Sequence, residues 1–270
     1  GSFLALNLYA NITPKFLDQS KEWQWICYWA GFFIIAFFIA RLLGLRGIQS
    51  FGLNRHRGFL KNLLIGLSLG ILIYSFKYLS FYSLGKFTIE GWMPFEHILP
   101  MLTLTLIGML FSSLINDLMI RGFWLAYLKK KNQMHWFVLV ATALYALDDS
   151  WNNGIQWMNI VFSAILGFSF AYSVYKTGSI WMSFGIHWGG NIMFRVMYGF
   201  NGQGIWKLEN IKEDVFFDYL SLIVTALLLP LLYFLLNGQR NNPDVHENHQ
   251  GKTLSDKKPD LLSKKETYLV

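Results

Sequence analysis

Long apolar runs, separated by short polar segments, divide the first 236 residues of the chain. Most of these runs approach or exceed the roughly 20 residues that an α-helix needs to cross the hydrocarbon core of a bilayer. We therefore predict an all-α, polytopic helical membrane protein with about seven transmembrane helices. The predicted spans are residues 23–43, 59–84, 98–128, 136–147, 155–175, 180–200 and 215–236.

The two ends of the chain differ from this pattern. Residues 1–22 are mildly apolar but interrupted by asparagines and a proline, so we interpret residues 3–17 as an interfacial segment rather than a span. Residues 237–270 are polar, poor in aromatic residues and mixed in charge, which is typical of a disordered tail. No cleavable signal peptide is expected, because the first span lacks a small-residue cleavage motif. The expected organisation is an interfacial segment (1–22), a transmembrane domain (23–236) and a tail (237–270).

Composition supports the membrane class and limits the partners. Hydrophobic residues make up 54% of the chain and charged residues only 14%, whereas a soluble domain has about a quarter charged residues. The net charge of +7 comes from Lys and Arg beside the spans and in the tail, so no nucleic acid is expected as a partner. Cytoplasmic loops are rich in Lys and Arg, and counting them places the N-terminus outside and the tail in the cytoplasm.

A few polar residues lie at depth inside the apolar runs, where they are costly and rarely without a role. They are Asn116, Asp117, Arg121, Asp148, Asp149, His187 and Asn191. With a rise of about 1.5 Å per residue, four of them fall about 11–21 Å from the cytoplasmic ends of their spans. Their depths overlap although the spans alternate in direction, so we expect one shared polar pocket near mid-membrane.

Helical spacing groups these residues further. Asp117 and Arg121 are four residues apart and share a helix face, so we expect them to pair, either to hold the bundle together or to serve a site. Asn116 is rotated by roughly 100° and faces another neighbour. His187 and Asn191 also share a face, where the histidine is either a packing residue or a ligand or proton carrier.

Two glycines beside the histidine, Gly189 and Gly190, let another helix or a ligand approach closely. We expect them to line a cavity or a tight helix contact. The chain has no phosphate-binding glycine loop, no cysteine cluster and no nucleophile elbow, so no metal or other cofactor is expected.

Three short motifs in this region resemble those of the CAAX prenyl protease and bacteriocin-processing (CPBP, or Abi) family. The family motifs are E-E-x-x-x-R-G, F-x-x-x-H and H-x-x-x-N, and the matching stretches read NDLMIRG from Asn116, YALDD from Tyr145 and HWGGN from His187. The resemblance covers roughly residues 101–200. It implies a CPBP-type helical bundle with a core at about 98–200, in a prokaryotic cytoplasmic membrane.

The resemblance also implies an activity, because the family consists of glutamate-type intramembrane proteases. In the family the first glutamate and first histidine activate water, and the last histidine and asparagine stabilise the oxyanion. Here Asn116 replaces the first glutamate, Asp117 the second, and Asp149 the first histidine. The positions that match the family are Arg121, His187 and Asn191.

The leading interpretation is a degenerate family member, because the amide at position 116 cannot act as a general base. Such a pseudoprotease would bind or regulate a membrane or envelope partner protein, or a membrane-anchored peptide, in the cavity between the third and sixth spans of the bilayer-embedded bundle. A second interpretation is an active, atypical endopeptidase that uses Asp149 as base together with His187. A small-solute transporter is less favoured, because neither an inverted repeat nor a pair of broken helices is visible.

Overall fold

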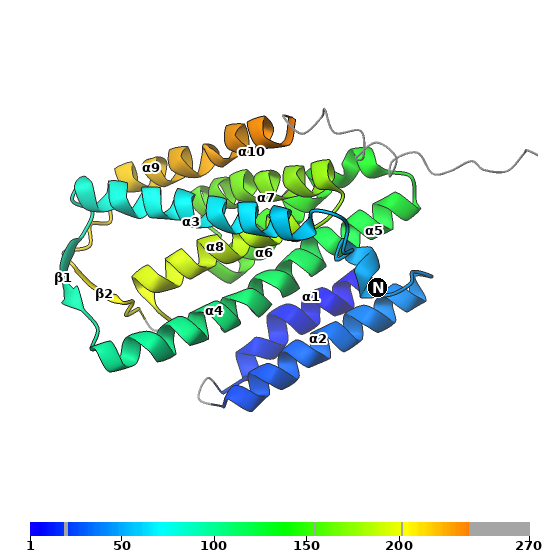
Figure 1. Cartoon of the computed structure of the whole chain (residues 1–270), viewed down its shortest axis with the longest axis horizontal. Coiled ribbons are helices and arrows are strands. Elements are labelled where there is room, and N and C mark those ends of the chain that lie inside the picture. The colour runs from blue at the N-terminus through cyan, green and yellow to red at the C-terminus, as the bar shows by residue number, and fades with distance from the viewer. Residues whose placement is uncertain (19–20, 154, 201, 238–270) are drawn as a thin grey trace, which may run out of the picture. The chain divides into compact units, whose positions relative to one another are not determined.

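The computed structural model describes residues 1–18, 21–153, 155–200 and 202–237, and they form an almost entirely helical bundle (Figure 1). The predicted tail at 238–270 lies outside the described residues. The helices are α1 (Ser2–Ile12), α2 (Glu22–Leu42), α3 (Phe59–Ser83), α4 (Phe95–Asp117), α5 (Phe123–Lys130), α6 (Phe137–Asn153), α7 (Trp157–Thr177), α8 (Trp181–Tyr198), α9 (Val215–Ala226) and α10 (Leu228–Asn237). Two short strands, β1 (Thr88–Trp92) and β2 (Trp206–Glu209), complete the chain.

Helical segments of the described chain are long and apolar enough to cross a membrane in five places. They are Glu22–Leu42, Phe59–Ser83, Phe95–Lys130, Trp157–Thr177 and Val215–Asn237. The all-α membrane class is therefore confirmed. The remaining two predicted spans correspond to α6 and α8, which are helices of 17 and 18 residues, and the count of seven stays a prediction.

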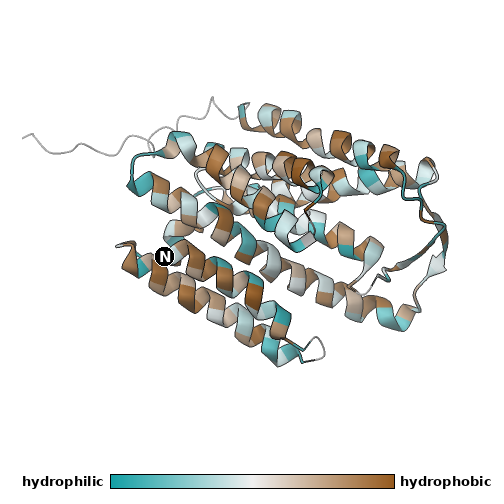
Figure 2. Cartoon of the chain, turned by 180° about the vertical axis from the view of Figure 1, so that it is seen from behind, coloured by the Kyte–Doolittle hydropathy of each residue, from teal (hydrophilic) through white to brown (hydrophobic). Residues whose placement is uncertain are grey.

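Hydrophobic residues predominate along many of the helix ribbons (Figure 2), and many of the large apolar side chains are exposed. Leu42, Phe95 and Phe234 are among the large hydrophobic residues with more than 70% of their surface exposed. A soluble monomer rarely shows such extended apolar surface. The protein is therefore embedded in a lipid bilayer, which supplies the contacts that this surface lacks.

The predicted span 136–147 ends too early, and residues 148–153, which were expected to belong to a loop, are helical. Helix α6 continues through both aspartates to Asn153. The apolar pattern ends at Leu147 because the next turn of the helix carries polar groups that find partners on other helices, and not because the helix ends.

The segment predicted to lie in the interface forms α1 and a 3₁₀ turn, Thr13–Phe16. Helix α1 contacts α2 through stacked rings of Tyr9 and Tyr28, whose centroids are 5.6 Å apart. The two hydroxyls donate to backbone carbonyls of the opposite helix. The placement of α1 relative to the membrane surface stays a prediction.

Glycines allow α3 and α8 to lie directly against each other (Figure 1). A side-chain carbon on Gly70 would lie 2.2 Å from the carbonyl oxygen of Ile186, and one on Gly189 would lie 2.5 Å from that of Leu67. Gly66 and Gly185 have carbonyl neighbours as close as these. The structure thus shows the tight helix contact expected from small residues spaced four apart.

The two strands pair antiparallel, with Thr88 opposite Glu209 and Trp92 opposite Trp206. They join the connection between α3 and α4 to the connection between α8 and α9, and the rings of Trp92 and Trp206 stack at 5.5 Å. Loops were expected in both connections, because strands of five and four residues leave little periodic signal in the sequence.

Candidate functional site

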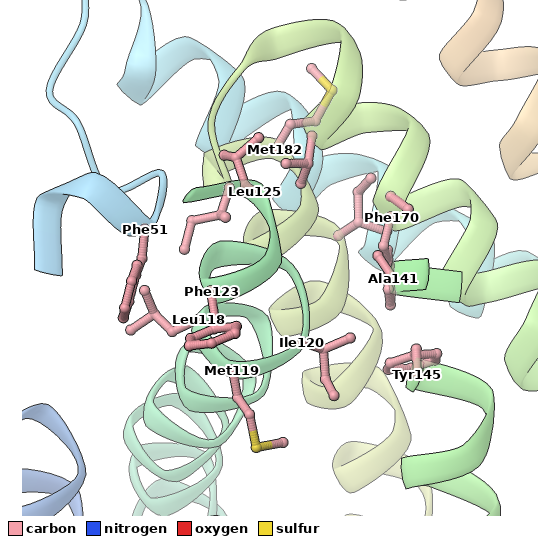
Figure 3. Close-up of a cluster of buried hydrophobic side chains, with 14 of the residues drawn as sticks. Phe51, Leu118, Met119, Ile120, Phe123, Leu125, Ala141, Tyr145, Phe170 and Met182 are labelled. Atoms are coloured by element: carbon pink, nitrogen blue, oxygen red, sulfur yellow. The ribbon is translucent and has the colours of Figure 1, made fainter. Parts of the chain in front are cut away.

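The site is built around a π-helical turn, Leu118–Gly122, between α4 and α5. Figure 3 shows Leu118, Met119, Ile120 and Phe123 spread around this turn among buried side chains of other elements. Gly122 lets the turn pack directly against the backbone at Phe51, because a side-chain carbon at position 122 would lie only 2.5 Å from the Phe51 carbonyl oxygen. A π turn often marks a functional segment, since it redirects side chains locally.

Asp117 is completely buried and is the centre of the polar cluster. Its Oδ1 accepts from Arg121 Nε at 2.6 Å and from the Ser183 hydroxyl. Its Oδ2 lies 2.9 Å from His187 Nδ1. The contact with a carboxylate, which only accepts hydrogen bonds when ionised, favours the tautomer with the proton on Nδ1, and the same Nδ1 also lies 3.4 Å from Arg121 Nη2. The structure therefore contains the predicted Asp117–Arg121 pair and adds His187 and Ser183 from α8.

Aromatic rings enclose the charged groups. The guanidinium carbon of Arg121 lies 5.0 Å from the ring centre of Tyr145 and 4.8 Å from that of Phe170. The same two rings contact His187, with centroid distances of 6.1 and 5.3 Å. Cation–π contacts of this kind compensate a buried guanidinium for part of its lost hydration. Tyr145, which together with Gly189 and Gly190 was predicted to be a cavity or packing residue, contacts both Arg121 and His187; Figure 3 shows its place beside Phe170 and Ala141.

Asn116 connects this cluster to a second carboxylate, on α6. Its Oδ1 accepts from Arg121 Nη2 at 3.2 Å, and its Nδ2 donates to Asp148 Oδ2 at 3.2 Å. The other oxygen of Asp148 accepts from Asn7 and Asn11 of α1, at 3.1 and 2.8 Å. A chain of hydrogen bonds thus runs from α8 through α4 and α6 to α1.

Asp148 was noted only as one of the polar residues at depth, and neither Asn7 nor Asn11 was predicted to belong to the site. A signal for the two asparagines was present, because they are four residues apart in an apolar segment and so share a helix face. Nothing local distinguishes Asp148 from Asp149, since adjacent helical residues point about 100° apart and only packing fixes which one faces α4.

Asp149 and Asn191 make contacts of their own. Asp149 accepts a hydrogen bond from the Ser163 hydroxyl on α7. Asn191 donates to the Ser113 hydroxyl on α4 at 3.0 Å. The described contacts therefore unite Asn116 with Asp117, Arg121 and His187, while Asp149 and Asn191 bind other partners.

The two glycines near the histidine contact α3 of the same chain. Gly189 lies in the α3–α8 contact, and a side-chain carbon on Gly190 would lie 2.9 Å from the ring of Tyr74. The neighbour that these glycines admit is therefore internal. In the part of the chain that the structure describes, no three His, Cys, Asp or Glu side chains gather in a way that could hold a metal ion.

Comparison with known proteins identifies the core that carries this cluster. Residues 98–193 match the family model described as type II CAAX prenyl endopeptidase Rce1-like. No curated protein and no solved structure matches the chain. The matched stretch contains all three motifs, so the resemblance to the CPBP family is confirmed.

Proposed function

Because this membrane protein carries a CPBP-family core, we propose that it is a pseudoprotease of that family, which binds a membrane-embedded partner instead of cleaving it. One observation carries the proposal: both ends of the Asn116 amide are engaged, one by Arg121 and the other by Asp148. The position that resembles the water-activating glutamate is thus a neutral bridge between two charged groups.

An amide suits this position for a simple reason. Its carbonyl accepts from the guanidinium while its NH₂ group donates to the carboxylate, whereas a glutamate at the same place would only accept. Asn116 and Asp148 therefore form a matched pair, in which the residue that removes the general base also satisfies a nearby carboxylate.

The other carboxylates around the site are engaged as well. Asp117 is held by Arg121, Ser183 and His187. Asp148 accepts three amide N–H groups, which occupy most of the acceptor sites of its carboxylate. Each of these carboxylates works as a structural acceptor, which favours a rigid polar core over proton transfer.

A partner would contact the outer surface of the bundle, because α3 covers the glycine face of α8. In the segment from Phe95 to Lys130, the apolar stretch of 18 residues that qualifies it as a span is 17% buried, the smallest such share among the candidate spans of the described chain. In the first half of α4, Phe95 and Leu99 are 86% and 72% exposed. We assign the contact with a membrane protein or a membrane-anchored peptide to this face.

Two measurements test the proposal. The purified protein in nanodiscs should not cleave prenylated or unmodified peptides. Leu99→Trp should remove a co-purifying membrane partner, while Leu72→Trp, at a 63% exposed position of α3, should leave it bound. Steady cleavage would refute the pseudoprotease, and a partner set that is identical in both variants would refute the α4 contact.

A hydrolase is the second candidate, and the carboxylate–histidine pair favours it. Asp117 holds His187 through Nδ1, and the His187 side chain is 13% exposed. A carboxylate that orients a histidine in this way lets the other ring nitrogen take a proton. If the protein cleaves peptides, two variants distinguish the possible bases. Loss of turnover in His187→Gln but not in Asp149→Asn identifies His187 as the base. Equal loss in both variants identifies Asp149 as the base acting together with His187.

A further inference from the structure

A pocket of about 250 Å³ lies where α2 and α5 end, away from the polar cluster. Its lining comes from Leu42, Leu43 and Leu45 on one side and from Tyr127, Lys130 and Lys131 on the other. Both helices belong to segments able to cross a membrane, and both of these segments terminate here. The pocket therefore lies at the level where hydrocarbon gives way to lipid headgroups.

Only positive charge surrounds this pocket in the adjoining sequence. Lys130 and Lys131 line it, and Lys129, Arg41 and Arg46 are close in the chain. Neither residues 41–58 nor residues 126–136 contain an aspartate or glutamate. An anion that enters the pocket thus meets no local repulsion.

The ammonium of Lys130 has donors to spare. Its Nζ donates to the carbonyl of Leu43 and so satisfies the end of α2. Gly44 makes room for the Lys130 ammonium at the end of α2, because a side-chain carbon at position 44 would lie 3.2 Å from Nζ. The φ of +71° at Gly44 also turns the chain away from the helix. A lysine ammonium has three N–H donors, so two remain for a ligand oxygen.

We propose that this pocket binds the phosphate-bearing headgroup of an anionic glycerophospholipid. Lys130 and Lys131 would contact the phosphate, and the acyl chains would lie along Leu42 and Phe38, which are 81% and 60% exposed. Basic pockets between membrane helices bind anionic headgroups in this way. The apolar wall favours a lipid over a free phosphate ion, because a phosphate ion has no acyl chains to bury against it.

Native mass spectrometry can test the site in the full chain. Protein in detergent is mixed with equal amounts of phosphatidylglycerol and phosphatidylcholine, and the ratio of the two adducts is measured. Lys131→Gln should lower the preference for phosphatidylglycerol about fivefold, the effect of one lysine near a headgroup. Lys131→Arg should keep the preference, and Lys129→Gln, a neighbouring lysine outside the pocket, should change it less than twofold.

Three results would overturn the proposal. They are an unmodified protein without preference, equal losses in Lys129→Gln and Lys131→Gln, and a preference that excess inorganic phosphate removes. The first denies the site, the second replaces it with diffuse surface charge, and the third assigns it to free phosphate. A thermal melt of each variant confirms that the fold is intact, so that each loss reports on the pocket.

Discussion

Asn116→Glu restores the residue of the family motif, and we expect it to destabilise this protein. The new carboxylate would lie beside Asp148, at the position where the Asn116 amide now donates across 3.2 Å. It would also lie beside Arg121, whose Nη2 is 3.2 Å from Asn116 Oδ1. The change in stability depends on the balance of three energies: the attraction to Arg121, the repulsion from Asp148 and the loss of the hydrogen bond from the Asn116 amide.

Coulomb's law gives the sizes. Two unit charges about 4 Å apart interact by about 4 kcal/mol at an effective dielectric constant of about 20. The attraction to Arg121 and the repulsion from Asp148 are therefore similar and cancel to first order. What remains is the lost hydrogen bond to a charged acceptor, about 1.5–3 kcal/mol. Asn116→Glu should thus lower the free energy of unfolding by about 2 kcal/mol.

The exchange of both residues should reverse the loss. In Asn116→Glu with Asp148→Asn, the amide at 148 donates to the new carboxylate and its carbonyl still accepts from Asn7 and Asn11. A double-mutant cycle, measured by unfolding in mixed detergent micelles, should give a favourable coupling of about 2 kcal/mol. Additive effects, with a coupling within about 0.5 kcal/mol of zero, would show that the two side chains do not share a hydrogen bond.

Three further predictions follow from the described contacts. Arg121→Ala leaves Asp117 charged and buried, so it should cost about 3–5 kcal/mol in unfolding assays, whereas Lys129→Ala should be neutral. Gly70→Ala places a carbon 2.2 Å from an α8 carbonyl and should reduce the folded yield, whereas Gly108→Ala, which meets nothing within 4 Å, should not. In intact cells, Thr88→Cys should react with an impermeant maleimide, and reaction only after lysis would reverse the predicted orientation.

The sequence predicted those features that depend on local pattern. Apolar runs marked the helices, and the i, i+4 spacing predicted the Asp117–Arg121 pair that the structure shows. Overlapping depths, which follow from the helical rise, predicted one shared polar pocket. The structure links Asn116 and His187 through Arg121 and Asp117, whereas Asp149 and Asn191 hydrogen-bond with Ser163 and Ser113.

Contacts that depend on the rotation of a helix about its axis, or on segments far apart in the chain, could not be predicted from the sequence. The choice of Asp148 over Asp149 depends on the way α6 packs on α7, where a side-chain carbon on Gly167 would lie 3.0 Å from the Tyr145 ring. The partners of Asp148 on α1 are 137 and 141 residues away along the chain. The pattern of residues within a single segment cannot predict a pairing between segments so far apart in the chain.

The π turn at Leu118–Gly122 has a consequence for the length of this segment. A deletion of one residue here would restore a continuous α-helix and leave hydropathy and composition almost unchanged. It would shorten the separation of Asp117 and Arg121 from four residues to three. Residues three apart still share a helix face, but Arg121 would be rotated relative to Tyr145 and Phe170, whose rings now enclose its guanidinium. The number of residues in this turn is therefore itself information, which a hydropathy plot cannot display and a single alignment gap would erase.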